Sequence, residues 1–106
     1  MKRGELWTLR DDRYASKARP VVIIQSDSLQ AFDSIILCLF TTFESEHIHT
    51  RVLIPSNPSN GLAKDSYVMT DKIVTVSKNE LGENIGVLTS EQMEKITEQL
   101  AVILGI

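Results

Sequence analysis

The chain has 106 residues, which is enough for one domain over residues 1–106 with one hydrophobic core. An apolar content of 42%, with only five glycines and three prolines, excludes a disordered chain. The net charge of −3 excludes a basic exterior, but six basic against three acidic side chains in residues 1–19 indicate an anionic partner for that segment.

The first third of the chain predicts two strands separated by a loop. Glu5–Leu9 alternates apolar and polar side chains, which is typical of a strand, and the polar segment Arg10–Ala18 predicts a loop. Val21–Gln25 is nearly all β-branched, so we expect a strand that is buried on both faces. We expect Ser28–Phe32 to form one short helical turn.

The middle of the chain predicts further short strands. They are Ser34–Thr42, Arg51–Ile54, Ser66–Thr70 and Ile73–Val76, with a kink near Asp71-Lys72. The segment Pro55–Gly61 has two prolines and predicts a turn-rich loop that tolerates insertions. Short strands at this spacing are typical of a barrel or a sandwich.

The C-terminal segment predicts one helix, Thr89–Leu104. Thr89 and Gln92 have the spacing of a capping box, and Gly105 is a suitable terminator. Apolar residues recur at spacings of three and four, at Met93, Ile96, Leu100, Ile103 and Leu104. This stripe predicts a helix whose apolar face covers the barrel.

Export and membrane insertion are not expected. No apolar stretch follows Lys2-Arg3, so we expect no signal peptide, and the longest apolar runs are too short to span a bilayer. Cys38 is the one cysteine and lies in an apolar strand, where we expect a buried side chain rather than a nucleophile. These features predict a cytoplasmic protein.

The pair Arg19-Pro20 stands directly before the apolar run Val21–Gln25. A residue before proline is pushed toward extended geometry, so Arg19 is held at the mouth of a core strand. A permanent charge in that place suits recognition of a phosphate by bidentate hydrogen bonding. The alternative is a solvated surface arginine that ends a loop.

Several of these segments together resemble the MazF/PemK family of bacterial toxins. The segments are Lys2–Trp7, Arg19–Asp27, the strand that ends in Thr41-Thr42, Asp65–Val68, Asp71–Val76, Leu81-Gly82, Ile85-Gly86 and the closing helix. The resemblance implies a mainly β fold with α structure, an SH3-like or CcdB-like β-barrel with a C-terminal helix. It also implies a homodimer that is inhibited by a MazE-like antitoxin.

The same resemblance implies the toxin of a type II toxin–antitoxin system. Such an enzyme is a sequence-specific, ribosome-independent endoribonuclease that cuts single-stranded RNA without a metal or another cofactor. The 2′-hydroxyl attacks the adjacent phosphorus, and the products carry 2′,3′-cyclic phosphate and 5′-hydroxyl ends. A toxin of the same fold that binds DNA gyrase, and an inactive barrel that only pairs with an antitoxin, are the alternatives.

By this resemblance, the catalytic residues are Arg19, Thr41 and Asp71. A guanidinium has a pKa above about 12 and is a poor general base, so Arg19 is expected to stabilise charge on the phosphate. Thr41 is expected to hydrogen-bond the phosphate, and Asp71 to accept the 2′-hydroxyl proton. For Thr41 the alternative is an ordinary strand residue, and for Asp71 an ordinary turn residue.

Seven further residues are candidates for RNA binding: Arg13, Tyr14, Lys17, Gln25, Ser26, Phe43 and Lys72. Tyr14 and Phe43 would stack on bases, and Gln25 and Ser26 would read base edges or the backbone. The loop before Arg19 is shorter than in most family members, and Lys72-Ile73-Val74 replaces the usual Gln-Ile-Arg. The RNA motif therefore does not follow from the resemblance.

One metal hypothesis is also open. His47 and His49 alternate along the chain, so two imidazoles could share a metal if the segment were a strand. Two ligands do not make a site, and the alternative is an exposed loop edge.

Overall fold

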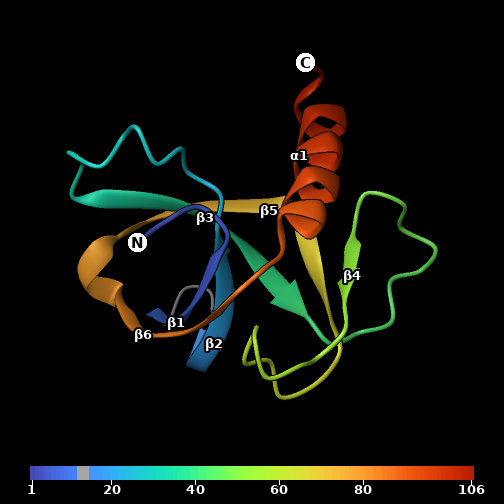
Figure 1. The fold of residues 1–106 in the computed structure, drawn as a ribbon, viewed down its shortest axis with the longest axis horizontal. Coiled ribbons are helices and arrows are strands. Elements are labelled where there is room, and N and C mark those ends of the chain that lie inside the picture. Colours follow the sequence, from blue (N-terminus) through green and yellow to red (C-terminus); the bar gives the residue numbers. More distant parts are fainter. Residues whose placement is uncertain (12–14) are drawn as a thin grey trace.

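The computed structural model describes the backbone of residues 1–11 and 15–106, and the side chains outside residues 11–16. Six strands and an α-helix follow in chain order (Figure 1). They are β1 (Glu5–Asp11), β2 (Ala15–Ile23), β3 (Ser34–Thr41), β4 (Val52–Ile54), β5 (Ser66–Ser77), β6 (Leu81–Val87) and α1 (Ser90–Leu104), with a 3₁₀ turn at Lys78–Glu80. The structure confirms the predicted mainly β fold with a C-terminal helix.

The strands form one antiparallel sheet in the order β4-β5-β3-β2-β1-β6. The sheet curls strongly, with the edge strands β4 and β6 on opposite sides of the view (Figure 1). The loop after β4 bridges the edges, since the Val87 amide on β6 donates to the Ser59 carbonyl at 3.0 Å. Curling and bridging together produce the barrel that the sequence predicted.

The Pro55–Gly61 loop is packed more closely than its composition suggested. Asn60 is buried, and its side chain donates to the Pro55 carbonyl at 2.8 Å and accepts from the Leu62 amide at 3.0 Å. Gly61 has a positive φ of 71°, and a Cβ there would collide with the Ile85 carbonyl on β6. The loop closes the barrel, and an insertion in it would disturb this packing, contrary to the prediction from its composition.

The predicted loop at Arg10–Ala18 is wrong at both ends, because β1 continues to Asp11 and β2 begins at Ala15. Ala15 pairs with Asp11, and β2 continues to Ile23. In the first half of β2, Lys17, Ala18 and Arg19 are all exposed, so this half of the strand shows no alternation of buried and exposed residues that its sequence could reveal. The backbone pairing of Arg19 with Leu9 on β1 makes Arg19 part of the sheet.

Three other predicted elements need comment. Ser28–Phe32 forms turns and no helix. Strand β6 was not predicted, because its polar residues and two glycines obscure the strand pattern. The kink near Asp71-Lys72 is confirmed as a register shift within one long β5, because Cys38 of β3 pairs with Ile73 but the next residue pairs with Met69.

The core consists of two clusters instead of the single core expected. Val22 and Cys38 belong to the cluster beneath α1, and Val21, Ile23 and Leu37 belong to the other. Neighbouring residues of β2 thus face different clusters, which confirms that this strand is buried on both faces. Burial raises the pKa of the Cys38 thiol to about 12, so this thiol stays protonated.

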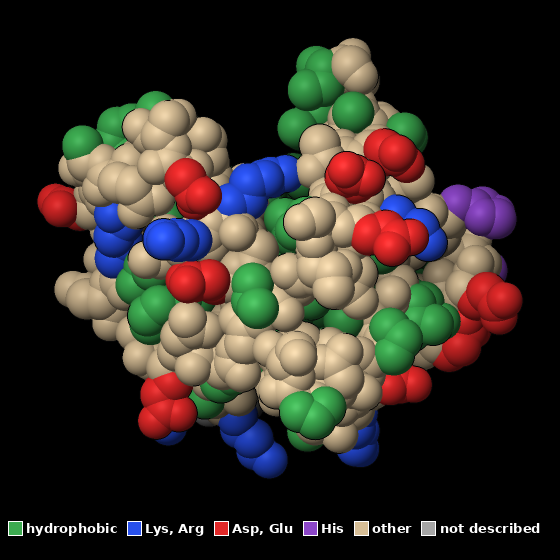
Figure 2. Space-filling model, viewed as in Figure 1, with side chains coloured by type: hydrophobic (Ala, Val, Ile, Leu, Met, Phe, Trp, Pro, Cys, Tyr) green, Lys and Arg blue, Asp and Glu red, His purple; other side chains and the backbone are tan. Residues whose placement is uncertain are grey.

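Helix α1 is defined at both ends as its sequence predicted. Thr89 and Gln92 form the reciprocal capping box, and Gly105 ends the helix in the left-handed conformation. Ile96 and Leu100 are buried against the sheet, but Ile103 and Leu104 lie beyond it with 39% and 57% of their surface exposed. Figure 2 shows hydrophobic side chains at this protruding end. In the described part of the chain, no helix is long and apolar enough to cross a membrane.

Candidate active site

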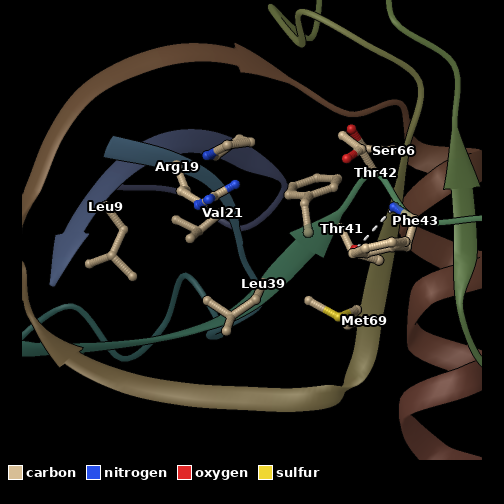
Figure 3. Close-up of a pocket in the computed structure, with 11 residues that line it drawn as sticks. Leu9, Arg19, Val21, Leu39, Thr41, Thr42, Phe43, Ser66 and Met69 are labelled. Carbon is tan, nitrogen blue, oxygen red and sulfur yellow. Dashed lines mark hydrogen bonds between the residues drawn. The ribbon is translucent and has the colours of Figure 1, made fainter. Parts of the chain in front are cut away.

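A cavity of about 280 Å³ opens beside the C-terminal end of β3 (Figure 3). Its apolar wall comes from four strands: Leu9, Val21, Leu39, Phe40 and Met69. Polar side chains join this wall: Arg19, Thr41, Thr42 and Ser66. An apolar cavity with a few polar groups is the usual form of a small-ligand site in a protein.

Arg19 is placed here by the pairing of β2 with β1. Leu9, the partner of Arg19 on β1, is fully buried and lines the same cavity. Val21, two residues after Arg19 on β2, also lines it. The Arg19 side chain itself is exposed, and Figure 3 shows it on one side of the cavity. The sheet thus presents a permanent cation at the rim of an apolar pocket.

Thr41 is the last residue of β3 and faces the cavity from the other side (Figure 3). Its Oγ1 accepts a hydrogen bond from the Phe43 amide at 3.2 Å. This local bond fixes the oxygen and leaves the hydroxyl proton to donate to a ligand. Phe43 follows at the rim with 82% of its surface exposed, which makes its ring available for stacking.

Arg19, Thr41 and Phe43 therefore line one cavity, whereas Asp71 does not. The described residues that line the cavity do not include Asp71. Its carboxylate accepts two hydrogen bonds from the Arg51 guanidinium, from Nε at 3.1 Å and from a terminal nitrogen at 3.0 Å. These bonds hold the pKa of Asp71 below its ordinary value, which makes the carboxylate a weaker base.

The ion pair predicts a pH-dependent stability effect for Asp71→Asn. Because the folded pKa is lowered, the pair stabilises the protein above the ordinary carboxyl range, and this stabilisation is lost as the pH falls through the folded pKa. We expect the variant to lose up to about 1 kcal/mol of unfolding free energy at neutral pH, and less below about pH 4. Urea unfolding at both pH values measures this, and an equal loss at both would contradict it.

Gln25 has a structural role instead of the predicted RNA contact. Its side chain is only 4% exposed, donates to the Leu29 carbonyl at 2.6 Å and accepts from the Ile36 amide at 3.2 Å. Both ends of the amide are thus occupied in joining the turn after β2 to β3. Ser26 is exposed and bonds to Ser28 at 2.8 Å, away from the cavity lining.

The other RNA-binding candidates are less closely defined. Lys17 and Lys72 are exposed, and neither is among the described residues of the cavity wall. Arg13 and Tyr14 lie outside the described residues. Ser66 and Arg51 were missed by the sequence analysis, because a serine that starts a strand and an arginine after a polar loop carry no distinctive pattern.

The metal hypothesis gains no support from the arrangement of His47 and His49. Both side chains are exposed, in a segment of turns between β3 and β4. Where side chains are described, no group of three or more His, Cys, Asp and Glu residues could hold a metal ion.

The curled antiparallel sheet, the single covering helix, and a cavity with a guanidinium and a hydroxyl define a small SH3-like β-barrel protein with a candidate site for an anion. The chain belongs to the family of PemK-like, MazF-like toxins of type II toxin-antitoxin systems, whose profile matches residues 2–104.

Similar proteins carry names from the same family. A probable endoribonuclease MazF of Mycolicibacterium smegmatis is 36% identical, over 100% of this chain and 98% of the relative. Endoribonuclease MazF4 of Mycobacterium tuberculosis is 32% identical, over 84% of this chain and 81% of the relative. A solved mycobacterial endoribonuclease in complex with its cognate antitoxin superposes with a TM-score of 0.84 and is 31% identical, covering 100% of this chain and 96% of that one.

Proposed function

We propose that this protein is the toxin of a type II toxin–antitoxin system and acts as a sequence-specific, ribosome-independent endoribonuclease on single-stranded RNA. The observation that carries the proposal is the placement of Arg19 and Thr41 on one cavity. Family membership and relatives named as endoribonucleases support it. A guanidinium and a hydroxyl on one phosphate suit RNA cleavage by the RNA's own 2′-hydroxyl.

In the proposed reaction, the 2′-oxygen forms a bond to the adjacent phosphorus as the bond from phosphorus to the 5′-oxygen breaks. The 2′-hydroxyl gives its proton to solvent, and the leaving 5′-oxygen takes a proton from Arg19, which solvent then restores, so no water is consumed. Negative charge grows on the non-bridging oxygens in the transition state. We assign to Arg19 the stabilisation of this charge and the donation of a proton to the leaving oxygen, and to Thr41 a hydrogen bond to a phosphoryl oxygen.

Phe43 is our candidate for holding the neighbouring base. Its exposed ring stands beside Thr41, and stacking on an aromatic face accepts any base. Lys17 lies on β2 two residues before Arg19, where its ammonium would contact the RNA backbone. Arg13, Tyr14, Ser26 and Lys72 remain predictions as RNA contacts.

A MazE-like antitoxin and a second copy of this chain are the proposed protein partners. A solved relative is described as bound to its cognate antitoxin, and the basic residues near Arg19 would attract an acidic segment. The exposed apolar end of α1 is suited to a contact between two copies. If antitoxin and RNA share one surface, saturating antitoxin should abolish RNA binding.

Cleavage in the presence of EDTA tests the proposed metal-free reaction. We expect purified protein to cut a long single-stranded transcript at the same rate with and without excess EDTA, because Arg19 and Thr41 need no metal to contact a phosphate. Denaturing gel electrophoresis of a time course measures this. Loss of cutting in EDTA, with recovery on addition of Mg²⁺, would contradict the mechanism.

A further inference from the structure

A chain of hydrogen bonds leads from Asp71 on β5 to the loop after β3. Asp71 holds Arg51 through the two bonds described above, and a third guanidinium bond runs from Arg51 to the Ser45 Oγ at 3.2 Å. Ser45 is only 1% exposed and donates its hydroxyl proton to the Phe43 carbonyl at 3.0 Å. One guanidinium thus ties a strand to a buried serine.

The same peptide segment fixes the hydroxyl of the active site. The Phe43 amide donates to the Thr41 Oγ1, and the Phe43 carbonyl accepts from Ser45. Phe43 is therefore held on both sides of its Cα, between the threonine in the cavity and the serine bound to Arg51. A shift of this residue would move both the exposed ring and the partner of the Thr41 oxygen.

Backbone bonds connect the remaining part of the loop. The Ile48 amide donates to the Ser45 carbonyl at 2.8 Å, and the Arg51 amide donates to the Ile48 carbonyl at 3.0 Å. Thr70, which is fully buried beside Asp71, donates its hydroxyl to the Thr50 carbonyl at 2.5 Å. The segment from Phe43 to Arg51 is thereby attached to β5 at two neighbouring points.

We infer that Asp71, Arg51 and Ser45 are positioning residues that hold Thr41 and Phe43 in the geometry needed for RNA cleavage. The inference rests on the proposed function and gives Asp71 a role other than that of proton acceptor. An arginine suits this place because its planar fork bonds the carboxylate and the serine at once. Arg51→Lys keeps the charge but loses this fork.

A double-mutant cycle with cleavage kinetics tests the inference. We expect Asp71→Ala and Arg51→Ala each to lower kcat by roughly 10-fold to 100-fold, the range for a displaced catalytic group, and the double variant to lose no more than either alone. Arg51→Lys should lower kcat by about as much as Arg51→Ala does, because lysine lacks the planar fork. A loss in Asp71→Ala that greatly exceeds the loss in Arg51→Ala would overturn the inference and favour a direct proton transfer by Asp71.

A wild-type kcat in both Asp71→Ala and Arg51→Ala would also overturn the inference. Thr75→Ala is the matched control, because Thr75 is exposed on the same strand and pairs with Ile36 on the far side of the register shift. We expect it to retain wild-type kcat, and melting temperatures of all variants separate misplacement from unfolding.

Amide hydrogen exchange gives a readout that needs no RNA. The Phe43 amide should exchange at least several-fold faster in Asp71→Ala than in wild type, whereas the Val22 amide in the buried part of β2 should not change. An unchanged Phe43 amide would reject the positioning role. If wild-type protein cuts no RNA, the proposed function fails, and the exchange measurement still decides on the network.

Discussion

Arg19→Ala is expected to lower the rate of RNA cleavage by a factor of about 10² to 10³ while the fold is retained. Loss of one preorganised donor to a developing anion costs about 3–4 kcal/mol of transition-state stabilisation. The side chain is exposed at the cavity rim, so its removal leaves no hole in either core cluster. Single-turnover cleavage of a short single-stranded RNA measures the effect.

The matched control is Arg19→Lys. The ammonium keeps the charge but cannot bond two phosphate oxygens in the planar geometry of a guanidinium, so we expect a rate between those of wild type and Arg19→Ala. Circular dichroism and melting temperature should match wild type in both variants. Near wild-type turnover in a folded Arg19→Ala protein would mean that the active site lies elsewhere.

Thr41→Val should lower cleavage by about 10²-fold, the lower end of the effect of losing one transition-state donor. Valine has the same shape and is equally suited to a strand, so β3 is expected to keep its register. The substitution removes both the proposed donor to the phosphate and the acceptor of the Phe43 amide. Comparison of kcat with KM should show the loss mainly in kcat, since the donor acts on charge that develops in the reaction.

Thr41→Ser separates the hydroxyl from the methyl group. It retains the oxygen that accepts from Phe43, so we expect activity within about 10-fold of wild type, less than the cost of one lost donor. If serine and valine at this position were equally impaired, the methyl packing and not the hydroxyl would be the important group.

Sequence patterns predicted the fold where one kind of residue dominates a segment. The β-branched run of β2, the apolar β3 and the amphipathic α1 with its capping box are all present. Sequence patterns did not predict the first half of β2 or any of β6, because these strands have few apolar residues in alternation. In both places backbone pairing with β1 decides the structure, and pairing partners distant in sequence leave no local signal.

For the candidate site too, local sequence features were predictable and contacts between distant segments were not. Arg19 stands out because a charge directly before Pro20 and a core strand is unusual, and the resemblance supplied Thr41. Asp71 and Gln25 have side-chain types suited to RNA chemistry, but their partners, Arg51 and the backbone around Ile36, come from segments 20 and 11 residues away. Side-chain partners of this kind depend on the tertiary structure, so the sequence alone could not predict the partners of Asp71 and Gln25.

The chemistry of the RNA ends tests the central proposal most directly. Cleavage fragments produced in EDTA should accept a radioactive phosphate from polynucleotide kinase at the 5′ end without prior phosphatase treatment, and mass spectrometry should find a 2′,3′-cyclic phosphate at the other end. Attack by the 2′-hydroxyl, with Arg19 and Thr41 on the phosphate, produces these ends. Fragments with 5′-phosphate and 3′-hydroxyl ends would contradict the mechanism, because they require attack by water.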